Sequence, residues 1–250
     1  EGPEEIGDEG DLEVLPKVTL DDVPNAGWEF PLEVDRGNIF THSCFTNQVV
    51  DASLMFDLGK VAVEDLPYVR LLAAVLPEVG CGGRSYTETL DHMLLYTADV
   101  GAGVGLHPQA DNPDLLRPAL AIEGKALRRN MDHLFPLFND MISSPDLKDR
   151  ARMEELLMQH LSSMENGLVH NAMRYAINQA GRGISPAGAI YSQWYGLDYL
   201  EAMRKAAKNI DGTIERLVAL ADQLLGAGEA ELVLGCDGEM KSEILGMLPT

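Results

Sequence analysis

The run from Ala126 to Ala207 constrains the fold of this chain most, because it can be read almost without gaps as a series of helices. Apolar side chains recur every three or four residues over 148–180, which places them on one helix face. They are Leu157, Leu161, Met164, Leu168, Ala172 and Tyr175. The sequence therefore predicts a long amphipathic helix here that packs along another element.

Two Ser-Pro pairs predict helix starts. Serine can accept a hydrogen bond from the free N–H groups of a first helical turn, and proline has no N–H to lose there. Ser144 with Pro145 and Ser185 with Pro186 fit this pattern. One helix is expected to begin at each pair.

The part before the helical run predicts strands and two shorter helices. Residues 31–45 and 47–59 are rich in β-branched and aromatic side chains, which is typical of paired strands, here joined near Thr46 and Asn47. Helices are expected over 64–79 and from Ser85 or Tyr86 to Tyr96, followed by strands over 98–107 and 116–126.

Three glycines, at 101, 103 and 105, interrupt the first of those later strands. They predict a bulge or the close approach of another backbone. A short strand is expected again after Leu225. This order of elements predicts an α+β unit with a mainly antiparallel sheet and helices layered on one face.

Charge is concentrated at the beginning of the chain. The net charge is −21, and residues 1–35 hold twelve Asp and Glu against Lys17 alone, which accounts for −11 and leaves −10 for the rest. A solvated linker is expected there, with an acidic surface that attracts basic peptides as the functional alternative. This charge argues against nucleic acid as a partner, because phosphate binding needs Lys and Arg.

Other features exclude further classes of protein. No apolar run approaches the ~20 residues that span a bilayer, so no membrane partner is expected. Cys44, Cys81 and Cys236 lie far apart without C-x-x-C spacing, which favours buried reduced thiols. The chain begins at Glu1 without Met, which is interpreted as a processed product or an excised part. No secretory leader is seen, so the cytoplasm or an organelle matrix is expected rather than secretion.

Four stretches carry a resemblance to a known family. They are LPYVRLLAAVLPEVGCGGRSYTE from Leu66, ALRRNMDHLFPLFNDMISSPDL from Ala126, AGRGISPAG from Ala180 and YGLDYLEAMRK from Tyr195. They resemble the peptidase-associated domain in the C-terminal half of pitrilysin-type (insulinase-like) metallopeptidases of the presequence-protease and falcilysin group.

The resemblance implies a pitrilysin-like metallohydrolase fold in a non-catalytic copy, followed by a long-helix segment. It also implies three parts: an acidic leader or linker over 1–30, the peptidase-associated α+β domain over 31–235, and the start of a connection to a following domain over 236–250.

Catalytic chemistry of the resembled family requires H-x-x-E-H on a helix, where the histidines hold zinc and the glutamate polarises water. The 250 residues contain no such motif, and no two of the six histidines lie three or four residues apart. The helix expected over 64–79 offers carboxylates and one Arg but no imidazole. We therefore expect no catalytic and no metal-binding residue in this chain, with zinc in the N-terminal half of the parent protein.

Three residues are candidates for contacts with other molecules. Trp194 and Tyr195 are predicted to lie at an interface, because large aromatics beside Gly196 are unusual on a solvated turn. Packing between helices and a pocket for a peptide side chain are the alternatives. Arg182 is a candidate peptide contact, since an Arg on a mobile turn can clamp a carboxylate. A solvated Arg beside a helix C-cap is its alternative.

The function that the resemblance implies is that of a non-catalytic domain in a zinc metallopeptidase that degrades short unfolded peptides inside a closed chamber. This domain would form part of the chamber wall. Its partners would be unfolded peptide substrates and the catalytic N-terminal half of the same polypeptide. The alternative is a catalytically inactive, peptidase-like scaffold or interaction subunit.

Overall fold

The computed structural model describes residues 18–27, 29–109, 111–226 and 230–248. The chain divides into two units, residues 1–30 and residues 31–250. Most of the predicted acidic leader falls outside the described residues; the described part of the first unit holds one 3-10 turn, Leu20–Asp22, next to Thr19. The second unit is α+β, which confirms the fold class expected from the sequence.

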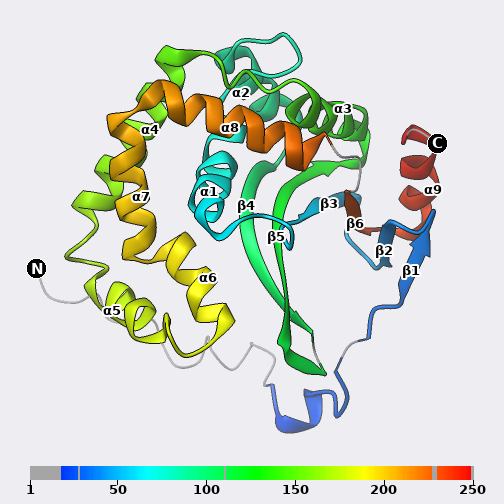
Figure 1. Cartoon of the computed structure of the whole chain (residues 1–250). Coiled ribbons are helices and arrows are strands. Elements are labelled where there is room, and N and C mark those ends of the chain that lie inside the picture. Colours follow the sequence, from blue (N-terminus) through cyan, green and yellow to red (C-terminus); the bar gives the residue numbers. More distant parts are fainter. Residues whose placement is uncertain (1–17, 28, 110, 227–229, 249–250) are drawn as a thin grey trace, which may run out of the picture. The chain divides into compact units, whose positions relative to one another are not determined.

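A sheet with the strand order β1-β2-β6-β3-β5-β4 runs through the described part of the second unit (Figure 1). Its strands are β1 (Leu32–Asp35), β2 (Ile39–Ser43), β3 (Val49–Asp57), β4 (Asp99–Gln109), β5 (Asn112–Leu127) and β6 (Glu231–Cys236). β2 and β6 are parallel, and the other neighbouring pairs are antiparallel. The sheet is therefore mainly antiparallel, as predicted.

The helices lie in two shells. They are α1 (Leu66–Val75), α2 (Tyr86–Tyr96), α3 (Met131–Ser143), α4 (Arg150–Asn166), α5 (Ala172–Gly181), α6 (Pro186–Tyr195), α7 (Leu197–Lys208), α8 (Ile210–Leu225) and α9 (Gly238–Met247). α1 contacts β4 and β5 as well as α6, α7 and α8, so it lies between the sheet and the outer helices (Figure 1). α3 packs on β5, and α9 packs on β2.

The sheet buries one face and leaves the other open. On β5, Leu120 and Ile122 are fully buried against the helices, whereas Glu123 and Lys125 point to the opposite side and are exposed. On that open face, Lys125 Nζ pairs with Asp51 Oδ2 of β3 at 3.0 Å. This alternation is what an antiparallel sheet with one covered face requires.

The glycines of β4 lie on the open face, where Gly101 and Gly103 have space above them and Gly105 faces the His107 side chain. A Cβ added at Gly101 or Gly103 would meet no atom within 4 Å, and the register of the β4–β5 pair shifts only between Pro108 and Gln109. The expected bulge or close backbone approach at these glycines is therefore wrong.

β2 and β3 do not pair with each other, although the sequence predicts one strand pair over 31–45 and 47–59. The first segment folds back on itself at Arg36 and Gly37, both at positive φ, and forms the β1–β2 hairpin. β6 then lies between β2 and β3. This pairing joins residues about two hundred positions apart, so no local sequence pattern encodes it.

The long helix predicted over 148–180 is interrupted. α4 ends at Asn166 and α5 begins at Ala172. Between them, Asn171 Nδ2 donates to the carbonyl oxygen of Gly167 at 2.9 Å, which satisfies a backbone acceptor that the broken helix leaves free. The apolar spacing continues across the break and therefore could not reveal it.

One of the two predicted Ser-Pro helix starts is confirmed. The Gly188 N–H donates to Ser185 Oγ at 3.1 Å, and Pro186 occupies the first helical position of α6. Ser144 instead follows the end of α3, and α4 begins only after Asp149, whose side chain caps it. The start expected at Ser144 is wrong because the downstream Asp is the capping residue.

Residues 236–248 pack with the same unit. Met240 and Ile244 of α9 are fully buried, and Lys241 Nζ pairs with Asp35 Oδ2 of β1 at 2.8 Å. Among the described residues, no helix combines the length and apolar character that a membrane crossing requires.

We expect Gly124→Ala to lower the free energy of unfolding by roughly 1–3 kcal/mol, the usual cost of overpacking a tight core. A Cβ at Gly124 of β5 would lie 2.8 Å from Leu134 Cδ1 and 2.9 Å from the Phe138 ring of α3. The matched control is Gly103→Ala, which should change stability by no more than about 0.5 kcal/mol. Urea denaturation measures both, and equal losses would contradict this account of the β5–α3 contact.

Candidate functional site

Helix α1 holds the position at which the sequence resemblance expects metal ligands, and here apolar side chains fill it. Leu66, Val69, Leu71, Leu72 and Val75 are all buried. A helix that is apolar around most of its circumference is stable only when it is surrounded by other elements, and α1 lies between the sheet and α6–α8. This helix serves the core and not an open active site.

Arg70, the basic residue of α1, is covered by two tyrosine rings. Its guanidinium carbon lies 4.3 Å from the centre of the Tyr195 ring and 4.9 Å from that of Tyr199. The Tyr199 hydroxyl and His160 Nε2 are hydrogen-bonded at 2.8 Å, and the Tyr195 hydroxyl donates to the Val104 carbonyl at 3.0 Å. We call Arg70, His160, Tyr195 and Tyr199 the Arg70 cluster; it joins α1 to α4, α6, α7 and β4.

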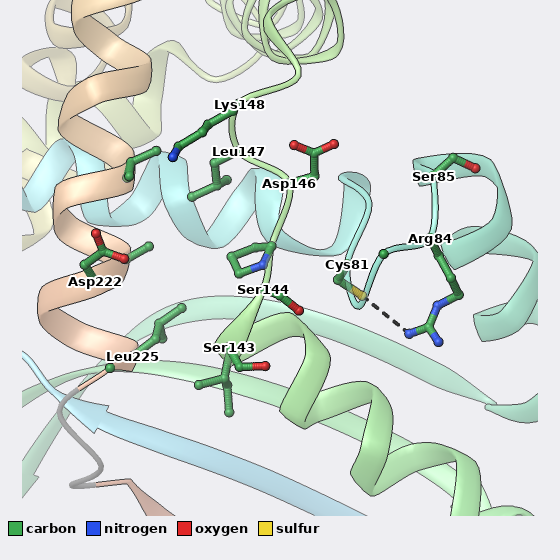
Figure 2. A pocket seen from close by; sticks show the side chains of 16 residues that line it. Cys81, Arg84, Ser85, Ser143, Ser144, Asp146, Leu147, Lys148, Asp222 and Leu225 are labelled. Atoms are coloured by element: carbon green, nitrogen blue, oxygen red, sulfur yellow. Dashed lines mark hydrogen bonds between the residues drawn. The ribbon is translucent and has the colours of Figure 1, made fainter.

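A hollow of about 900 Å³ lies between the turn after α1, the end of α3 and the end of α8 (Figure 2). Charged Arg84, Asp146, Lys148 and Asp222 line it together with apolar Ile142, Leu147, Val218 and Leu225. Its wall has the mixed character of a small-molecule pocket, so its polar groups need individual inspection.

Several polar groups on one side of this hollow bind one another. Arg84 Nη2 donates to Cys81 Sγ at 3.8 Å, as the dashed line in Figure 2 marks, and pairs with Asp140 Oδ2 at 2.7 Å. The Ser144 hydroxyl accepts from the Gly82 N–H at 3.2 Å. These contacts fasten the turn to α3, and the lining residues include no histidine that could activate Cys81 or Ser144 as a nucleophile.

The described residues contain no cluster of side chains that could bind a metal ion. No group of three or more His, Cys, Asp or Glu side chains there is arranged to hold an ion. His92 of α2 and His133 of α3 lie with ring centres 5.4 Å apart, and the Tyr96 ring stacks on His133 at 3.7 Å. These two imidazoles join the two helices by ring packing.

A second hollow, of about 430 Å³, lies on the open face of the sheet. Met55, Asp57, His107, Arg117, Pro118, Ala119 and Glu231 line it. Arg117 lies between two carboxylates, with its guanidinium 3.7 Å from Asp57 Oδ2 and 4.0 Å from Glu231 Oε1. All three side chains are largely exposed, so this hollow offers both signs of charge to a molecule that lies against the sheet.

The interface hypothesis from the sequence requires Trp194 to lie at the surface, but the structure buries it. Its side chain is 0% exposed, whereas Tyr191, on the outward side of α6, is 41% exposed. The ring packs with its own unit because α6 turns Ser192 and Trp194 inward. This burial corrects the interface assignment of Trp194.

The other two candidates are also tied to neighbours. Tyr195 is part of the Arg70 cluster and holds the backbone of β4. Arg182 Nη1 pairs with Asp198 Oδ1 at 3.0 Å, next to the end of α5, and remains half-exposed. The structure therefore brings Trp194 and Tyr195 together inside the molecule and leaves Arg182 at its surface.

Sequence reasoning missed a group of exposed apolar side chains on and beside α5. Val169, Met173, Ile177 and Ile184 are 84%, 74%, 63% and 81% exposed. The spacing of Val169, Met173 and Ile177, four residues apart, is a visible signal. The apolar pattern through Leu168, Ala172 and Tyr175 is longer and predicts the buried face of one continuous helix, so sequence reasoning does not assign the second pattern to a surface.

A family model for the associated domain of peptidase M16, subfamily C, matches residues 4–205 of the chain. The mitochondrial presequence protease of Danio rerio is 24% identical over 168 residues, which are 67% of this chain and 16% of that protein. Presequence protease 1, chloroplastic/mitochondrial, of Arabidopsis thaliana is 25% identical over 219 residues, or 85% of this chain and 20% of that protein. The chain thus spans only about a fifth or less of these relatives.

Solved structures share the fold. A peptidase M16 inactive domain from Pseudomonas fluorescens aligns with a TM-score of 0.51 and 14% identity, covering 89% of this chain and 51% of that one. A conserved protein from Enterococcus faecalis aligns with a TM-score of 0.61 and 10% identity, covering 84% and 49%. Together with the family model, these findings confirm the resemblance stated from the sequence.

Trp194→Ala should lower the free energy of unfolding by about 3–5 kcal/mol, because removing a fully buried ring leaves a cavity. Tyr191→Ala, on the outward side of the same helix, should cost no more than about 0.5 kcal/mol. Guanidinium denaturation of both variants measures the difference. A loss at Trp194 as small as that at Tyr191 would show that the ring does not fill the core.

The pH dependence of stability should include a contribution from His160. Burial, and next the charge of Arg70, lower its pKa from the ordinary 6.5. The unfolded chain therefore binds a proton at His160 more readily than the folded chain does. The contribution of neutral His160 to the free energy of unfolding is complete above pH 6.5, and it is lost as the pH falls towards the lower pKa of the folded state.

We therefore expect acidification from about pH 7.5 to about pH 5 to destabilise the wild type more than His160→Gln, which cannot titrate. Urea denaturation at both pH values provides the comparison. His170→Gln, at an exposed position, is the control and should keep the wild-type pH dependence. If His160→Gln keeps the pH dependence of the wild type, protonation of buried His160 does not destabilise the fold, and this explanation is wrong.

Proposed function

Because the chain belongs to the family of domains associated with peptidase M16, subfamily C, we propose that it serves as a non-catalytic domain within a longer zinc metallopeptidase of the presequence-protease type. The relatives are several times longer than this chain, which leaves room for a catalytic half elsewhere in the same polypeptide. Zinc would be held there by the two histidines of an H-x-x-E-H motif, and the glutamate of that motif would polarise the attacking water. This chain would contribute surface and support.

The observation that carries the proposal is the packing of α1. A catalytic copy of the domain would expose two histidines and a glutamate on this helix towards its substrate. Here the helix is buried by its own unit, and Arg70 is enclosed by Tyr195 and Tyr199. The fold is kept while the catalytic position is used for packing.

The open sheet face supports a role as part of a chamber wall. One face of the sheet is covered by helices, and the other presents Asp57, Arg117 and Glu231 around the smaller hollow beside apolar Met55. Unfolded peptides vary in sequence, and a wall with both charges and apolar area can contact many of them. The net charge of −21 would also raise the local concentration of basic peptides through its long-range electric field.

The alternative function, an inactive scaffold subunit, uses the same fold without a catalytic partner. The coding sequence upstream of Glu1 distinguishes the peptidase domain from the scaffold subunit. An H-x-x-E-H motif there favours the peptidase, and its absence favours the scaffold.

Zinc content and peptide cleavage test the proposed function directly. The full-length protein should hold about one zinc per polypeptide and cleave a short unfolded fluorogenic peptide, whereas the 250-residue chain should hold less than about 0.1 and cleave none. Elemental analysis after dialysis and a fluorescence assay measure both quantities. One tightly held zinc in the 250-residue chain, lost together with activity on chelation, would overturn the proposal.

A further inference from the structure

The apolar side chains Val169, Met173, Ile177 and Ile184, named here the α5 surface, form the feature that the proposed function does not yet use. Each is more than 60% exposed. Single exposed apolar residues are ordinary on soluble proteins, but a group of large ones on and beside one helix, here Met173 and Ile177 within α5 and Val169 and Ile184 next to its ends, marks an interaction site.

The attachment of α5 leaves this stripe facing outward. Tyr175 is the buried residue of the helix, and Asn178 Nδ2 donates to the Tyr195 carbonyl of α6 at 3.2 Å. At about 100° per residue, Met173 and Ile177 lie roughly 160° and 200° around the helix from Tyr175. Both therefore point directly away from the rest of the unit, on a helix that is held from one side only.

The chain around the α5 surface also lacks carboxylates. Residues 166–197 contain no Asp or Glu, although the chain has 40 of them in 250 residues. Arg174 and Arg182 are the basic residues of this stretch, and Arg182 is paired with Asp198. Charged residues are depleted in the cores of protein interfaces, so the absence of carboxylates here fits a surface that is covered in the working protein.

The size of the surface decides between possible occupants. A stable complex between separate molecules uses about 20–30 residues on each partner, and four large side chains with a few alanines fall short of that. Within one polypeptide a small patch is sufficient, because the tether raises the effective concentration of the two surfaces. The relatives provide such a tether, since most of their length lies outside the matched region.

We propose that the α5 surface docks against another domain of the same full-length polypeptide. This inference rests on the proposed function in placing the chain within a longer protein. The proposed contact is apolar, is centred on Met173 and Ile177, and does not involve the open sheet face.

Met173 supplies the probe, because exposed methionine is oxidised by peroxide to the sulfoxide while the peroxide is reduced to water. In the 250-residue chain Met173 should react nearly as fast as added N-acetyl-methionine. In the full-length protein it should react at least about tenfold more slowly. Peptide mass spectrometry follows both, and buried Met203 sets the slow limit in each.

A substitution links the protection to this surface. Ile177→Asp places a charge beside Met173 and should restore fast oxidation in the full-length protein, while leaving the melting temperature of the 250-residue chain within about 2 °C. The matched control is Gln179→Asp, an exposed polar position on the same helix, which should leave Met173 protected.

Equal oxidation rates of Met173 in the chain and in the full-length protein would overturn the inference. Protection in the 250-residue chain that increases with its concentration would assign the surface to a second copy and overturn it as well. The oxidation rate does not depend on catalysis. A full-length protein without zinc but with protected Met173 would therefore defeat the proposed function and keep the docking surface.

Discussion

The burial of α1 between the sheet and the outer helices is the constraint on which the rest of this unit depends. A ten-residue helix has little stability alone, so its apolar circumference must be enclosed by β4 and β5 on one side and by α6, α7 and α8 on the other. The Arg70 cluster supplies the polar part of this enclosure. It places two tyrosine rings against the one cation of α1 and ties four further elements to the helix.

The same constraint explains how a peptidase fold can persist without catalytic groups. Polar ligands on α1 would need an open cavity above them, and that space is occupied here by Tyr195 and Tyr199. Trp194 belongs to the same packing. Trp194 and Tyr195, which sequence reasoning assigns to an interface, are therefore part of the packing between α1 and α6, and their neighbour Gly196 marks a close helix connection rather than an exposed turn.

The sequence predicts those features that depend on local chemistry. The helix start at Ser85 or Tyr86, the Ser185 cap and the α+β order of elements follow from hydrogen bonding within a turn and from periodicity. It could not predict the insertion of β6 between β2 and β3, which is a pairing of distant segments. It also misjudges α4 and α5 as one helix, because an apolar stripe records which side chains face the core and does not record where the backbone stops.

The open sheet face and the α5 surface differ in chemistry, and this difference separates the roles that we propose for them. The open sheet face carries paired charges, such as Lys125 with Asp51, and a hollow in which Arg117 lies between carboxylates. Such groups remain hydrated and can exchange water for a passing ligand at little cost. The α5 surface offers the exposed apolar side chains Met173 and Ile177 in a stretch of sequence without Asp or Glu, and hydration of that area is unfavourable at all times. A face that must stay open is thus polar, and a face that gains from permanent cover is apolar.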